Sequence, residues 1–146
     1  MDLESSKKVL RISGFLTIVG AILSVASGAM GLVLGKAAEQ MPEVVGNPDY
    51  QQGAKALLNS GLAEIIAGVL SLFEGGCTIS AGKTGKYAGA AFVFASIGFT
   101  GSILGALSMV LKHEITTTKV ISFVLAIILN AIIFVAAGKV RKANKQ

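Results

Sequence analysis

Four long apolar stretches, separated by short polar segments, divide the chain. Three of them contain no Asp, Glu, Lys, Arg or His: residues 12–35, 87–111 and 120–138. The fourth lies between Lys55 and Lys83 and is interrupted only by Glu64 and Glu74. Each stretch is close to or above the roughly 20 residues that an α-helix needs to cross a hydrocarbon core of about 30 Å. The pattern therefore predicts four transmembrane helices.

The predicted fold class is all-α, a polytopic integral membrane protein whose four-helix transmembrane bundle forms a single domain over residues 1–146. We expect spans at about residues 10–35, 57–82, 87–111 and 119–138, an outer loop at 36–56 and a basic cytoplasmic tail at 139–146. Composition agrees, because 53% of the residues are hydrophobic and only 14% are charged, against about 25% in soluble domains. Four spans leave no room for a soluble domain.

Positive charge is unevenly distributed between the two sides of the predicted bundle. The N-terminal segment, the connection after the second span and the C-terminal tail hold nine of the 13 basic residues: Lys7, Lys8, Arg11, Lys83, Lys86, Lys139, Arg141, Lys142 and Lys145. These three segments share one side of a four-span protein, so the excess of Lys and Arg predicts cytoplasmic N- and C-termini. The expected location is the cell (plasma) membrane, where the tail contacts anionic headgroups. The net charge of +5 therefore requires no nucleic-acid partner.

The outer loop is expected to be the largest exposed surface. Its first residues, KAAEQM, favour helix and should extend the first span past the bilayer. Pro42 favours a break in the helix. The sequence Asn47-Pro48-Asp49 predicts a turn, with a helix that begins at or near Asp49 and leads into the second span.

Two short motifs resemble sites of chemistry, but each lacks an essential residue. The run GGCTISAGKTGK suggests a phosphate-binding loop, yet Cys77 stands where that motif needs its first glycine. His113-Glu114 resembles the start of a zinc-binding helix, but the chain has only one histidine. With one His, one Cys and no paired nucleophile and base, we expect no catalytic residues, no metal, no cofactor and no enzymatic activity.

Glycines recur every seven residues in the second span and at related spacings in the third. We name the following seven glycines the glycine seam: Gly61, Gly68, Gly75, Gly82, Gly98, Gly101 and Gly105. Lipid tails provide no hydrophobic driving force between helices, so packing depends on close backbone approach and interhelical hydrogen bonds. We therefore expect glycine-seam packing, with the second and third spans joined seam to seam. In the first span, small residues follow two lines at four-residue spacing: Gly20, Ser24 and Gly28, and Ser27, Gly31 and Gly35. Two such lines predict two neighbouring helices.

Three polar side chains inside the spans are the candidate functional residues: Glu64, Glu74 and Asn130. At 1.5 Å per residue, Glu64 lies about 13 Å inward from Lys55, well inside the hydrocarbon. Intramembrane carboxylates are often proton- or cation-handling groups, which is one hypothesis for Glu64. The other is a structural hydrogen bond from a protonated carboxyl to one of four side chains: Ser96, Thr100, Ser102 or Asn130. We expect Glu74 to be structural and to meet Arg11, and Asn130 to face protein.

The leading hypothesis for function is a small non-catalytic membrane module that assembles with itself or with a larger membrane complex. The alternative is a small homo-oligomeric transporter or channel that uses Glu64 for proton or cation coupling. These two hypotheses belong to different classes, because the first needs only packing surfaces and the second needs a pathway with a titratable group.

Overall fold

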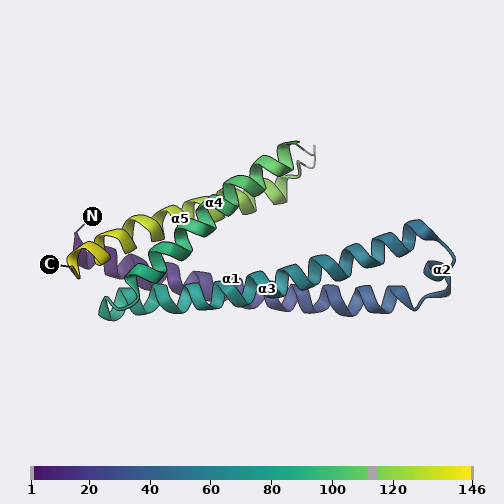
Figure 1. Cartoon of the computed structure of the whole chain (residues 1–146), viewed down its shortest axis with the longest axis horizontal. Coiled ribbons are helices and arrows are strands. Elements are labelled where there is room, and N and C mark those ends of the chain that lie inside the picture. Colours follow the sequence, from purple (N-terminus) through teal and green to yellow (C-terminus); the bar gives the residue numbers. More distant parts are fainter. Residues whose placement is uncertain (1, 112–114, 146) are drawn as a thin grey trace. The chain divides into compact units, whose positions relative to one another are not determined.

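The computed structural model describes residues 2–111 and 115–145 and is all-helical (Figure 1). Its helices in this part of the chain are α1 (Leu3–Glu39), α2 (Pro42–Val45), α3 (Pro48–Thr84), α4 (Ala88–Leu111) and α5 (Thr117–Ala143). Four of them, α1, α3, α4 and α5, are long and apolar enough to cross a membrane. The predicted all-helical fold is thus confirmed, with four helices that could span a membrane. His113 and Glu114 lie outside the described residues.

The connection between α1 and α3 has a break in the helix at each of its two prolines, Pro42 and Pro48. Pro42 occupies the first turn of α2, where a missing backbone N–H breaks no intrahelical bond. Asn47 precedes α3, and its side-chain Oδ1 accepts a hydrogen bond of 3.0 Å from the backbone N–H of Asp49. Helix α3 therefore begins at Pro48, which agrees with the start expected at or near Asp49.

The chain divides into two compact units. Unit 1 comprises residues 1–16 and 74–146, and unit 2 comprises residues 17–73. Helices α1 and α3 each contribute one part to unit 1 and the other part to unit 2.

In unit 1, α4 and α5 lie side by side as an antiparallel hairpin (Figure 1). The buried core joins this hairpin to the beginning of α1 and the end of α3, and most of its members are alanines: Leu10, Ala81, Ala88, Ala91, Ala95, Ile133, Ala136, Ala137 and Val140. Small side chains allow helix backbones to approach closely, which is how helices gain packing energy in lipid. This end of unit 1 is therefore held together by close helix contact.

A tight turn connects α3 to α4. Gly85 and Tyr87 both adopt positive φ angles, 78° and 61°. The Gly85 N–H donates to the Ala81 carbonyl at 3.0 Å, which ends α3 as a glycine after a helix C-terminus commonly does. The Asn144 side chain donates from Nδ2 to the Gly85 carbonyl at 2.7 Å. The end of α5 thereby fixes the turn between the preceding two helices.

Unit 2 consists of the part of α1 from residue 17 onward, the part of α3 up to residue 73, and α2 between them. Many of its large apolar side chains are exposed, among them Leu23 and Met30 at 65% each. Such exposure is costly in water but is expected on helices that face lipid tails. The unit therefore has the surface of a membrane-embedded helix pair.

Candidate functional site

Glycines of α3 lie against the backbone of α1. In unit 2, a Cβ atom added at Gly61 would lie 2.6 Å from the Gly28 carbonyl oxygen, and one added at Gly68 would lie 2.9 Å from the Ala21 carbonyl oxygen. In unit 1, a Cβ atom at Gly82 would lie 2.6 Å from the carbonyl oxygen of Lys7. Ordinary van der Waals contact of a Cβ begins at 3.4 Å. No residue with a side chain fits these positions without moving α1.

The close approaches follow one register. The paired residues advance by seven along both helices in opposite directions: Lys7 with Gly82, Gly14 with Gly75, Ala21 with Gly68, and Gly28 with Gly61. The prediction that these α3 glycines pack against the third span is therefore wrong, because the atoms nearest to them belong to α1. The physical reason is that α1 carries small residues at the same seven-residue spacing. The two lines of small residues on α1 were predicted to contact two different helices. At these positions they contact the same one, because Gly28 of one line and Gly31 of the other both lie close to Gly61.

Two glycines of α4 lie against side chains of α5. A Cβ atom at Gly98 would lie 2.5 Å from Oδ1 of Asn130, and one at Gly105 would lie 2.6 Å from Cε1 of Phe123. Gly101 has no such neighbour within 4 Å. The half-buried Asn130 also donates from Nδ2 to the Ala126 carbonyl of its own helix at 2.9 Å. The Asn130 side chain thus lies against Gly98 of α4 and is bonded to its own helix.

Glu64 is exposed and borders a groove of about 500 Å³ between α1 and α3 in unit 2. The groove is lined by small or apolar residues and by this one carboxylate: Leu23, Ala26, Ser27, Met30, Gly31, Leu34, Leu57, Ser60, Gly61 and Glu64. The backbone carbonyl of Glu64 accepts a hydrogen bond of 3.1 Å from Ser24 Oγ. Within unit 2, residues 17–73, the Glu64 carboxylate itself has no hydrogen-bond or ion-pair partner.

The four side chains predicted to form a hydrogen bond with Glu64 donate to backbone carbonyls. Each donates to a carbonyl four residues earlier in its own helix: Ser96 to Phe92, Thr100 to Ser96, Ser102 to Gly98, and Asn130 to Ala126. Such back-bonding satisfies a hydroxyl or an amide locally. The hydrogen bond from Glu64 stays a prediction.

Glu74 and Thr78 stand one turn apart on α3 in unit 1. Glu74 Oε1 and Thr78 Oγ1 are both enclosed by protein and have no hydrogen-bond partner among the described residues. The predicted contact of Glu74 with Arg11 is not found among the described residues: Glu74 Oε1 has no partner, and Arg11 donates from Nε to the Gly82 carbonyl at 2.8 Å. That carbonyl is one of the last four of α3, which lack intrahelical partners and attract a cation. Arg11 therefore completes the end of α3.

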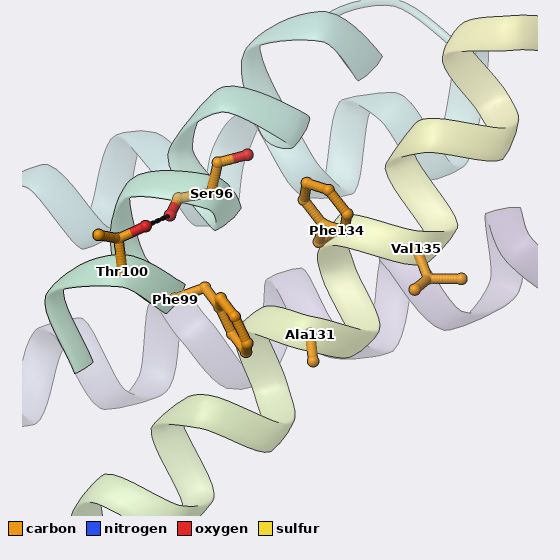
Figure 2. A pocket seen from close by; sticks show the side chains of 6 residues that line it. All are labelled: Ser96, Phe99, Thr100, Ala131, Phe134 and Val135. Carbon is orange, nitrogen blue, oxygen red and sulfur yellow. Dashed lines mark hydrogen bonds between the residues drawn. The ribbon is translucent and has the colours of Figure 1, made fainter. Parts of the chain in front are cut away.

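Two further grooves run along α4 and α5. The first, about 300 Å³, is basic and aromatic, and is lined by Phe92, Gly138, Arg141, Lys142 and Lys145. The second, about 290 Å³, is largely apolar, and is lined by Ser96, Phe99, Thr100, Ala131, Phe134 and Val135 (Figure 2). Sequence reasoning identified the basic tail but missed the aromatic residues beside it. The available signal was the three- and four-residue spacing that places Phe134, Gly138 and Arg141 on one face of a helix.

No family model matches the chain, and no curated protein and no solved structure matches it. The arrangement of this chain's own residues therefore provides the evidence for a function. Three features of that arrangement are distinctive: the close approach of α1 and α3, the carboxylate of Glu64 beside a groove, and the two grooves along α4 and α5.

Proposed function

We propose that this chain is a small, non-catalytic, four-span membrane protein that assembles with itself or with a larger membrane complex. The observation that carries this proposal is the exposed Glu64 within an apolar helix. A charged side chain at the centre of a membrane helix costs about 2.5–3.5 kcal/mol on insertion scales, so such groups face protein or water. A second helix that covers the groove beside Glu64 would remove that cost.

The lining of this groove favours a helix as the covering element. Gly31, Ser27 and Ser60 leave little side-chain volume along it. Small residues allow two helix backbones to approach, and hydroxyls provide interhelical hydrogen bonds. A partner helix could therefore pack against this face and donate a hydrogen bond to Glu64.

The proposal includes the packing and orientation expected from the sequence. The seven-residue register of α1 with α3 supports glycine packing as the interaction that holds these helices together. The excess of Lys and Arg near both termini supports cytoplasmic ends in the plasma membrane, with anionic headgroups as the lipid contact.

The alternative function is a small oligomeric transporter or channel. It is favoured by the same carboxylate, because Glu64 borders about 500 Å³ of open groove and has no partner within residues 17–73. A titratable group beside such a space is the arrangement that a proton- or cation-coupled pathway requires.

The mass of the intact complex tests the assembly proposal. The protein is extracted in a mild detergent and its mass is measured without denaturation. We expect either a homo-oligomer or a complex with a second membrane protein. A population that is entirely monomeric at several detergent concentrations would contradict assembly.

The substitution Glu64→Gln separates assembly from transport. If Glu64 only forms a hydrogen bond, the amide keeps the shape, and stability changes by no more than the roughly 0.6 kcal/mol typical of such bonds in membranes. We expect no proton or cation flux in liposomes that contain the parent. Flux that the parent shows and Glu64→Gln lacks, at equal stability, would favour transport. Glu43→Gln, on the exposed α2, is the matched control.

A further inference from the structure

The basic groove at the end of α5 has the chemistry of a phosphate site. Arg141 lies over the Phe92 ring, with its guanidinium carbon 5.3 Å from the ring centroid. Lys142 and Lys145 line the same groove. A guanidinium binds a phosphate through two parallel hydrogen bonds, and lysines add charge without fixed geometry. Basic residues near a helix C-terminus also stabilise the helix dipole, but that role requires neither a groove nor an aromatic wall.

The apolar groove and the basic groove are both lined by residues of α4 and α5. Phe92 lines the basic groove, Phe134 lines the apolar groove, and their rings stack with centroids 4.4 Å apart. The stacked pair therefore contributes one ring to each groove. Beyond this pair, Phe99 and the apolar residues of α5 form the walls, as Figure 2 shows.

The two grooves lie on one face of the hairpin. Lining residues are spaced by three or four on both helices: Phe92, Ser96 and Phe99 on α4, and Ala131, Phe134, Gly138 and Arg141 on α5. Residues at this spacing share a helix face. The polar end lies at the end of α5, and each helical turn inward moves about 5.4 Å towards its apolar middle.

We propose that this face binds one anionic phospholipid, with its phosphate between Arg141 and Lys142 and an acyl chain in the apolar groove. The order of chemistry along the groove, basic, then aromatic, then apolar, is the order of a phospholipid from headgroup to chain. Basic pockets between membrane helices hold anionic headgroups by charge and hydrogen bonding. The proposal rests on the proposed contact with anionic headgroups and assigns that contact to defined residues.

Retention of lipid by the intact protein tests the assignment. The protein is reconstituted with equal amounts of phosphatidylglycerol and phosphatidylcholine that carry identical acyl chains, and the lipids retained after gentle release are counted by native mass spectrometry. We expect the parent to retain phosphatidylglycerol preferentially. Arg141→Gln/Lys142→Gln should reduce that preference roughly 10- to 30-fold, since each basic residue near the surface contributes about one factor of five. Equal retention of both lipids by the parent would overturn the proposal.

A charge-matched control separates a site from general attraction. Lys8→Gln/Lys86→Gln removes the same charge at two exposed lysines of unit 1 that do not line the groove. This control should keep the preference, and an equal loss would overturn the site. Ala131→Leu fills the apolar groove and should lower retention, whereas displacement of the lipid by inorganic phosphate alone would overturn the lipid assignment. The same mass spectra also give the number of subunits, so a failure of the assembly proposal is distinguished from a failure of lipid binding.

Discussion

Replacing Gly61 by alanine should separate α1 from α3 in unit 2. The added Cβ would lie 2.6 Å from the Gly28 carbonyl oxygen, 2.9 Å from the Leu32 nitrogen and 3.2 Å from the Gly31 carbonyl carbon. All three are backbone atoms, so no side-chain rotation relieves the overlap. Because ordinary contact begins at 3.4 Å, the helices must move apart by most of an ångström. Neighbouring contacts along the register are then lost as well.

The expected cost of Gly61→Ala is about 1–3 kcal/mol, the usual range for overpacking a tight contact. Stability is measured by titrating a mild detergent with sodium dodecyl sulfate and following helicity, together with size exclusion after heating. The matched control is Gly53→Ala on the same helix, where the added Cβ would meet nothing within 4 Å. Because alanine favours helix over glycine, the control should be neutral or stabilising by up to about 1 kcal/mol.

The difference in stability between Gly61→Ala and Gly53→Ala tests the close approach of α1 and α3. A Gly61→Ala protein that is as stable as Gly53→Ala would refute the close approach of α1 and α3. Loss of stability in both proteins would show that glycine itself, and not its neighbour, matters at these positions. Only destabilisation confined to Gly61→Ala agrees with the structure.

Two further substitutions test local features. Gly85→Ala should destabilise the protein by about 1–2 kcal/mol, because the φ of 78° at Gly85 is unfavourable for side chains and the new Cβ would lie 2.9 Å from Asn144 Oδ1. Gly85→Asn should cost less in the same sodium dodecyl sulfate titration. Asp2 caps the start of α1 by accepting a bond of 2.6 Å from the Ser5 N–H, which lowers the Asp2 pKa below its ordinary value of 3.8. Its stabilisation is therefore present above about pH 4 and lost as the pH falls through the lowered pKa. The Ser5 amide resonance should follow this titration, and Asp2→Asn should abolish it.

The apolar pattern was sufficient to predict the four long helices. Uncharged runs of this length have no other stable form in lipid than a helix whose backbone groups bond within it. The sequence also located the breaks at Pro42 and near Pro48, because proline lacks the N–H that a helix interior needs. These features depend on local chemistry, which a single sequence contains.

The partners of the polar and small residues could not be predicted in the same way. Arg11 could reach either a carboxylate or an unpaired carbonyl, and charge alone favours Glu74, yet the helix end at Gly82 is the group it meets. Choosing between them requires the rotation of α1 about its axis. Likewise, the seven-residue spacing of Gly14, Ala21 and Gly28 was obscured by shorter spacings on the same helix.

The register of α1 with α3 also limits how these helices can move. If α1 slid by four residues in unit 2, Leu32 would come to the position of Gly28 against Gly61. A leucine side chain does not fit there, because a Cβ atom added at Gly28 would already lie 2.5 Å from the Gly61 carbonyl oxygen. A slide of three residues, roughly 4.5 Å at 1.5 Å per residue, would instead bring Gly31 to that position, and Gly31 already lies close to Gly61. The small residues of α1 therefore permit a slide of three residues along Gly61 and oppose a slide of four.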